Sequence, residues 1–337
     1  MFELFSYPFM QRALLAALFT GLAAPAVGTY IVQRRLALMG DGIGHVAVTG
    51  VALGLLTGIA PTWTAVTVAV LGAILIEVIR ERGHTNGDVA LALLFYGGLA
   101  GGVLLTGLAD KSAANLQEYL FGSITTISVD DVYITMAFAV VVILVGVGLS
   151  PQLFAVAQDE EFARVAGLRV RTYNLLVAVL AAVSVTIAMR TVGLLLVSAL
   201  MVVPVATAQQ LTRSFRTTLG AAMALGMLAS VGGLSLSALA PAGTRVAPGS
   251  TIVLLALAGF VVTWPLGAWL RHRQVLRTPF PALPPDDGTP TSSHEVTEHP
   301  HDHGPDCGHV AVPHGDHVDY VHGGHRHAPH GEHYDEH

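Results

Sequence analysis

Residues 34–47 read RRLALMGDGIGHVA, a pair of arginines followed by an apolar segment that carries two ionisable side chains, Asp41 and His45. These two residues are four positions apart, about one helical turn, so on a helix they share one face. Ionisable groups inside a bilayer are costly and rare, and they usually face a polar cavity on an ion or proton path. The stretch therefore predicts a membrane-spanning helix with a candidate cation site.

The composition of the chain also indicates a membrane protein. Of its 337 residues, 53% are hydrophobic and 12% are charged, whereas soluble domains carry about 25% charged residues. The charges lie between long apolar runs, each near the ~20 residues that cross a bilayer as a helix. We predict an all-α polytopic membrane protein with eight or nine spans, near residues 12–32, 42–58, 62–80, 89–108, 131–150, 173–189, 191–210, 217–239 and 250–270.

The distribution of basic residues predicts the orientation, because cytoplasmic loops carry an excess of Lys and Arg. Nine crossings with the N-terminus outside place twelve arginines inside, namely Arg34, Arg35, Arg80, Arg82, Arg164, Arg169, Arg171, Arg213, Arg216, Arg271, Arg273 and Arg277. Four basic residues fall outside or near it: Arg12, Lys111, Arg190 and Arg245. This asymmetry favours a cytoplasmic C-terminus. If one of the spans on either side of Arg190 is re-entrant, the number of spans is eight and the C-terminus changes side.

A His-rich tail follows the last span. Residues 278–288 read TPFPALPPDDG, a Pro-rich linker that separates a transmembrane domain, residues 1–277, from a tail, residues 278–337, and thirteen of the sixteen histidines lie from His294 onward. The tail has too little apolar surface to bury a core, so we expect it to be disordered without metal. His-rich tracts bind metal, and the candidate ligands are His299, His301, His303, Asp306, Cys307, His309, His325 and His327. The alternative is a solvated tail without a specific ligand.

The chain has no phosphate-binding loop of its own. Its single lysine, Lys111, follows Asp110, so the Gly-Lys-Ser/Thr sequence of a P-loop ATPase is absent. We therefore expect no enzyme activity in this chain, and any ATPase that drives it must be another polypeptide. Residues 158–170, QDEEFARVAGLRV, are a candidate docking helix between two spans: Asp159, Glu160, Glu161, Phe162 and Ala163 lie at its start, and Gly167 is the expected C-terminal stop. The alternative is a helical loop with no partner.

Four segments, in this order, resemble the zinc/manganese-type metal ABC transporter permeases: residues 34–45, YLFG at 119–122, residues 159–170, and VGLLLVSALMVVPVATA at 192–208. The resemblance covers most of residues 10–270. It implies a bacterial plasma-membrane protein, homodimeric or paired, with cytoplasmic ATP-binding cassette ATPases and an extracytoplasmic metal-binding protein that delivers the ion. It also implies import, a coupling-helix role for residues 159–170, and a translocation path lined by Asp41 and His45. The His-rich tail departs from the family pattern.

We hypothesise that Asp41 and His45 form a half-site that a second copy of the chain completes. A transport site needs few ligands per chain, because it must release its ion as well as bind it. The structural alternatives are a helix N-cap for Asp41 and a core histidine bonded to a carbonyl for His45. We expect Glu77 to form an ion pair with Arg80, one turn away, and the pairs Gly97-Gly98 and Gly101-Gly102 to permit close helix contact.

A divalent metal is the expected substrate, with no permanently bound cofactor and no nucleic-acid partner. The imidazole-rich tail favours zinc, and manganese, iron, nickel and cobalt remain open. Two other function classes are compatible with these residues. A proton-coupled secondary carrier also uses Asp and His one turn apart, although we find no inverted repeat of that pair. A membrane metal sensor is suggested by the tail.

Overall fold

The structure is a computed structural model that describes residues 6–81, 87–109, 119–120, 122, 127–191, 193–240, 246–275, 294–296, 307–314, 317–322, 325–330 and 333–336. The chain divides into two compact units, residues 1–264 and 265–337. The boundary that we predict at residue 277 lies outside the described residues.

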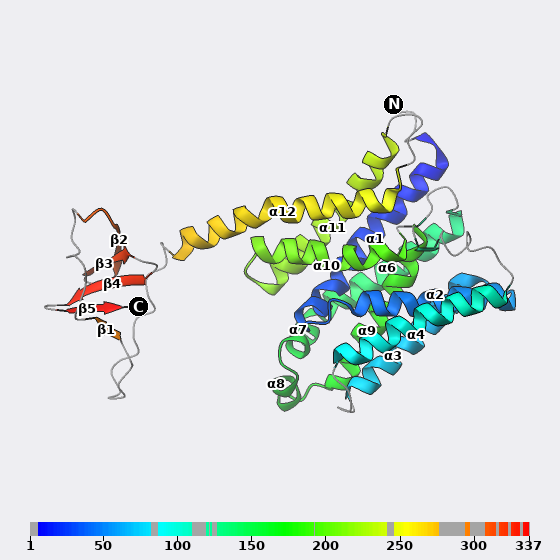
Figure 1. Ribbon diagram of the computed structural model, residues 1–337, viewed down its shortest axis with the longest axis horizontal. Helices are drawn as coiled ribbons and strands as arrows, with labels where there is room; N and C mark the ends of the chain where they lie inside the picture. Colours follow the sequence, from blue (N-terminus) through cyan, green and yellow to red (C-terminus); the bar gives the residue numbers. More distant parts are fainter. Residues whose placement is uncertain are drawn as a thin grey trace. The chain divides into compact units, whose positions relative to one another are not determined.

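In the part of the chain that the structure describes, the first unit contains helices and no strands (Figure 1), and the last of these helices runs past residue 264. They are α1 (Pro8–Gln33), α2 (Met39–Thr57), α3 (Pro61–Glu81), α4 (Gly87–Leu108), α6 (Val129–Gly148), α7 (Ser150–Gln158), α8 (Glu160–Val165), α9 (Val170–Thr191), α10 (Leu194–Leu211), α11 (Phe215–Ala238) and α12 (Pro248–Val275). Eight of the described helices are long and apolar enough to cross a membrane. The remaining predicted span, residues 191–210, corresponds to α10, whose apolar part is shorter. The predicted all-α membrane fold of eight or nine spans is confirmed.

Helix α1 lies at the centre of this unit, where it packs against α6, α7, α9, α10 and α11 (Figure 1). Its residues from Ala23 to Ile31 are all buried, because small side chains let the neighbouring helices approach on every side. The Tyr30 hydroxyl donates to the carbonyl oxygen of Gly146 in α6 at 2.6 Å. The C-terminal end of α1, which leads into Arg34 and α2, is therefore held by the core.

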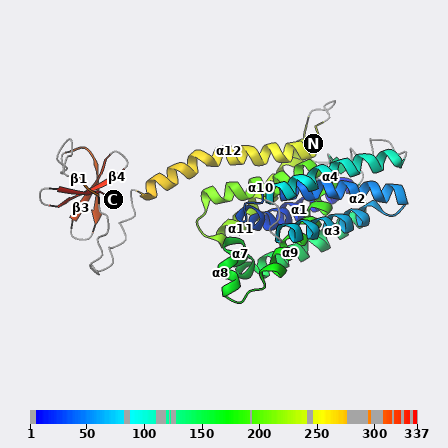
Figure 2. The ribbon, with the colours of Figure 1, turned by 60° about the horizontal axis from the view of Figure 1, so that its bottom comes forward.

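Helices α2, α3 and α4 lie side by side (Figure 2), and the contact between α2 and α4 is the most extensive. It depends on Gly98: a Cβ there would lie 2.6 Å from the backbone nitrogen of Val46 and 2.7 Å from the carbonyl carbon of His45. The Thr49 hydroxyl also donates to the carbonyl oxygen of Gly98 at 2.5 Å. The expected close contact is confirmed at Gly98, and also at Gly101 and Gly102, whose Cβ positions lie 3.2 Å from Thr49 and 3.0 Å from Val48 on α2. It is not confirmed at Gly97, which has no neighbour within 4 Å of its Cβ position.

The second unit contains strands in the tail, where we expected disorder. The strands β1 (His294–Val296), β2 (Val310–His314), β3 (His317–His322), β4 (His325–His330) and β5 (His333–Glu336) form an antiparallel sheet in the order β1-β5-β4-β3-β2. Two residues separate each consecutive pair from β2 to β5, a spacing that suits hairpins. Val312 and Tyr320 are buried. These local hairpins pair the backbone groups of the strands with little apolar surface, which explains why composition alone predicted disorder.

Replacement of Gly98 by alanine should separate α4 from α2. The new methyl group meets backbone atoms, which cannot move aside as a flexible side chain can, so we expect a loss of stability on the order of 1–3 kcal/mol. Thermal unfolding of the purified protein in detergent measures this as a lower midpoint. Gly97→Ala is the matched control, because its methyl group enters open space. Equal midpoints for the two variants would contradict the assigned helix contact.

Candidate metal-transport site

Asp41 and His45 lie on the first two turns of α2. Helix α2 begins at Met39 after a short turn, and its N-cap residue is Leu38, which makes no side-chain capping bond. The N-cap alternative for Asp41 is therefore wrong: this residue is inside the first turn of the helix. A carboxylate in that turn is favoured by the partial positive charge of the helix N-terminus. This position lowers the cost of an anion at the edge of an apolar helix.

Ser198 on α10 orients the Asp41 carboxylate. Its hydroxyl donates to Oδ1 of Asp41 at 2.9 Å, a contact between residues that are 157 positions apart in the chain. An ionised carboxylate has about four lone-pair positions, so this bond leaves most of them for a cation. A fixed partner of this kind sets the direction in which a ligand carboxylate presents its oxygens.

The His45 side chain is buried, with 5% of its surface exposed. Its Nδ1 atom has no hydrogen-bond partner among the described residues. Its ring meets the ring of Phe95 on α4 edge-on, with the two centroids 4.2 Å apart. Buried polar atoms are nearly always paired, and an exception calls for an explanation such as an ion. A core histidine could bond to a carbonyl through Nδ1, and among the described residues His45 makes no such bond.

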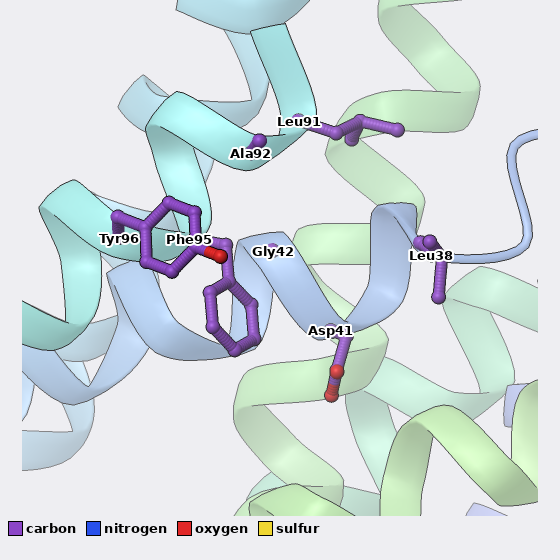
Figure 3. Close-up of a pocket in the computed structure, with 7 residues that line it drawn as sticks. All are labelled: Leu38, Asp41, Gly42, Leu91, Ala92, Phe95 and Tyr96. Carbon is purple, nitrogen blue, oxygen red and sulfur yellow. The ribbon is translucent and has the colours of Figure 1, made fainter. Parts of the chain in front are cut away.

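A cavity of about 220 Å³ opens beside Asp41. Figure 3 shows its lining, which comes from the start of α2 and from α4: Leu38, Asp41, Gly42, Leu91, Ala92, Phe95 and Tyr96. Water occupies about 30 Å³ per molecule in the liquid, so the cavity has room for an ion with part of its hydration shell. Asp41 is the charged residue in an otherwise largely apolar and aromatic lining.

One chain offers two candidate ligands, Asp41 in the lining of the cavity and His45 outside that lining. Within the residues that the structure describes, no group of three or more His, Cys, Asp or Glu side chains is placed to hold a metal ion. Structural zinc sites, in contrast, have four protein ligands. Asp41 and His45 are thus fewer than the ligands of such a site.

The candidate docking segment, residues 158–170, contains α8, which the extended residue Asp159 separates from α7. The Asp159 side chain caps α8 by accepting from the backbone N–H groups of Glu161 and Phe162, each at 2.9 Å. Gly167, with φ of +84°, ends the helix as predicted. The backbone N–H of Gly167 donates to the Arg164 carbonyl and that of Leu168 to the Ala163 carbonyl, a common helix-terminating motif. Helix α8 therefore has fixed ends.

One face of α8 packs inward and the other is exposed. Ala163 is fully buried in a small cluster with Val156 and Val170. Phe162 and Val165 are 66% and 89% exposed. Exposed apolar side chains that lie together commonly mark an interaction surface.

The structure describes only some of the predicted metal ligands in the tail. His299, His301, His303 and Asp306 lie outside the described residues. Cys307 and His309 are partly buried just before β2, and His327 is buried on β4 opposite Tyr320. His325 is also on β4, opposite His322.

Sequence reasoning missed two features of the site. Ser198 is a polar residue in the long apolar run 192–208, a signal that could have marked it as a partner of Asp41.

The predicted pair of Glu77 and Arg80 is confirmed at 2.7 Å. However, two further charges join it, from Arg34 and Glu160.

Comparison with known proteins gives consistent matches over the helical unit. Residues 6–266 match the ABC 3 transport family. The manganese import system permease protein ScaB of Streptococcus parasanguinis is 36% identical over 259 residues, which cover 77% of this chain and 90% of ScaB. The manganese transport system membrane protein MntC of Halalkalibacterium halodurans is 30% identical over 263 residues, 78% of this chain and 88% of MntC.

A solved structure is also similar. PsaBC from Streptococcus pneumoniae in complex with Fab superimposes with a TM-score of 0.71 at 32% identity, over 80% of this chain and 97% of that chain. The family match ends at residue 266, so the His-rich tail lies beyond it.

Replacement of Ser198 by alanine should weaken cation binding without unfolding the protein. Loss of an outer partner of a metal ligand typically lowers affinity 10- to 100-fold. Titration of Mn²⁺ into the purified protein, followed by calorimetry, measures the change. Ser235→Ala is the control, because the Ser235 hydroxyl donates only within its own helix in the structure, to the Val231 carbonyl oxygen at 2.8 Å. An unchanged affinity in the Ser198 variant would remove this residue from the site.

Proposed function

The chain belongs to the ABC 3 transport family, and we propose that it is the membrane permease subunit of an ATP-driven importer that carries a divalent metal through a site made by Asp41 and His45. The observation that carries this proposal is the pair itself: a carboxylate beside a cavity and a buried imidazole with an unpaired nitrogen, one turn apart on a membrane helix. The ATPase is a separate subunit, and the protein resides in the plasma membrane as a multi-pass permease.

Two copies of the chain complete the metal site. One Asp and one His per chain are too few to replace the hydration shell of an ion, whereas two such pairs supply four ligands. A closed four-ligand cage within one chain would hold the ion too firmly, because conduction needs both entry and release. A site divided between two chains can lose ligands when the chains move apart. The division thus links release of the ion to a movement of one copy against the other.

Manganese is the cargo that these observations favour. The similar proteins ScaB and MntC are both named for manganese import or transport, and carboxylate and water oxygens are ligands that suit Mn²⁺. Zinc is the second candidate, favoured by the imidazole-rich tail. Within the membrane site, one carboxylate and one imidazole per chain accept either ion.

Helix α8 docks the ATPase. Phe162 and Val165 expose apolar side chains, and the exposed Glu161 adds a charge beside them. The cores of protein interfaces are enriched in aromatic residues. The bend at Asp159 and the stop at Gly167 hold α8 as a rigid block that can move as one piece.

The tail binds metal through its histidines, with Cys307 and His309 among the ligands and with zinc as the preferred ion. The five-stranded pairing of its described segments supports this proposal, since a sheet brings histidines from neighbouring strands to matching positions. A tail of this kind buffers zinc or reports on its level.

Uptake by vesicles tests the transport proposal. Vesicles that contain the permease, its ATPase and its delivery protein should take up ⁵⁴Mn²⁺ with ATP, and faster than ⁶⁵Zn²⁺. In Asp41→Asn, which removes the ligand charge and keeps the size of the side chain, uptake should fall to background while the complex still assembles. Full uptake by Asp41→Asn would contradict the proposed site, and faster zinc uptake would reverse the choice of ion. Loss of wild-type uptake when the proton gradient is collapsed at constant ATP would favour a secondary carrier.

Deletion of residues 278–337 separates a transporter from a sensor. We expect the initial rate of Mn²⁺ uptake to be unchanged, because the membrane site and α8 lie in the first unit. The deleted protein should bind fewer Zn²⁺ ions at saturation, measured by equilibrium dialysis against the full chain. Abolished uptake would support the sensor function, and equal zinc binding would show that the tail holds no metal.

A further inference from the structure

Four charged side chains form a cluster at the end of α1: Arg34, Glu77, Arg80 and Glu160. One guanidinium nitrogen of Arg34 lies 3.2 Å from Glu77 and 3.3 Å from Glu160. One nitrogen of Arg80 lies 2.7 Å from Glu77 and 3.2 Å from Glu160. Two cations and two anions thus balance each other within one set of contacts.

The charge cluster is partly shielded from solvent. The side chains of Arg34 and Glu77 are each 3% exposed, that of Arg80 is 24% exposed and that of Glu160 is 40% exposed. Burial lowers the pKa of the Arg34 guanidinium, and the carboxylates of Glu77 and Glu160 oppose this shift. Removing one member of a buried ion pair leaves an uncompensated charge, which is strongly unfavourable. The four side chains therefore have to keep their contacts when the surrounding helices move.

Glu160 connects α8 to three other parts of the fold. It is the first residue of α8, and its Oε1 atom accepts from Arg34 at the end of α1, from Arg80 on α3 and from Asn174 on α9. The Asn174 amide lies 3.0 Å from this oxygen. The other charged residue at the start of α8, Glu161, is exposed. A displacement of α8 is thus applied to the cluster through one carboxylate.

The connection from Arg34 to α2 is short and internally bonded. The backbone N–H of Leu36 donates to the Ile31 carbonyl at 3.0 Å, and that of Met39 donates to the Leu36 carbonyl at 2.8 Å. Arg35 has φ of +59°, an unfavourable conformation for a residue with a Cβ that persists only where the surroundings hold it. This turn thus connects Arg34 to the first turn of α2, where Asp41 lies.

We propose that Glu160 is the coupling residue of this transporter: its carboxylate transmits the movement of α8 through Arg34 and Arg80 to the first turn of α2, and so changes the position of Asp41. This inference rests on the proposed function, and it adds the chain of contacts between the ATPase and the metal site. Hydrogen-bond and ion-pair networks are among the structures that carry such energetic coupling. Glu160 acts through its neighbours and does not touch the ion.

The experiment uses the complete transporter in vesicles, with Mn²⁺ as the ion. Glu160→Gln keeps the shape of the side chain and an oxygen that accepts from Asn174, but it removes the charge that pairs with Arg34 and Arg80. We expect the variant to assemble with the ATPase, to hydrolyse ATP and to bind Mn²⁺. The number of ions transported per ATP hydrolysed should fall roughly tenfold, within the range of measured coupling energies. Restoration of part of this ratio by Glu160→Asp would show that the charge is required.

Glu81→Gln is the matched control. Glu81 lies one helical turn after Glu77 on α3 and pairs with Arg171 at 3.1 Å. The side chains of Glu81 and Arg171 are 43% and 62% exposed. Exposed ion pairs contribute little, so the ratio of transport to hydrolysis should be that of the wild type. A second variant, Arg80→Gln, removes another contact of Glu160 and should also lower the ratio.

A wild-type ratio in Glu160→Gln would overturn the coupling role. Loss of assembly in both Glu160→Gln and Arg80→Gln would overturn it as well, because the cluster would then be required for folding and not for coupling. Neither result would affect the proposed function as long as the wild type transports Mn²⁺ and Asp41→Asn does not. Absence of wild-type transport would instead refute the proposed function itself.

Discussion

The hydrogen bond from Ser198 to Asp41 stabilises a carboxylate among apolar helices. The free-energy cost of placing that carboxylate there is the main constraint on this fold. An ionised group at membrane depth is tolerated only where it has polar partners or faces a cavity with water. Asp41 accepts from a hydroxyl at 2.9 Å and lies beside a cavity of about 220 Å³. The hydroxyl comes from α10, so α10 has to lie against the first turn of α2. The packing of the other helices around α2 keeps these two segments together.

The same constraint explains the use of small residues in the core. The buried run of α1 from Ala23 to Ile31 allows close contact with several helices, and Gly98 allows α4 to touch the backbone of α2 beside His45. Close contact on one side of α2 places Phe95 against the imidazole and leaves the cavity next to Asp41. The same contact between α2 and α4 therefore produces both the tight packing around His45 and the cavity beside Asp41.

Much of this arrangement could be predicted from the chain, and the remainder depends on contacts between distant residues. Long apolar runs predicted the spans, and the spacing of Asp41 and His45 predicted their shared helix face. Gly167 predicted the end of α8 because local backbone geometry determines it. In contrast, the contact of Arg34 with Glu160 joins residues that are 126 positions apart, and no local pattern gives such a pairing. The strands of the tail were missed because composition does not register short hairpins.

We propose that two chains share one ion through Asp41 and His45. Counting the Mn²⁺ ions bound to the purified full-length permease, with and without the Asp41→Asn change, tests this most directly. The difference between the two proteins excludes ions held by the tail, because both proteins carry it. We predict that the substitution removes one ion for every two chains. A loss of one ion per chain would contradict the shared site, and no loss would show that Asp41 is not a ligand.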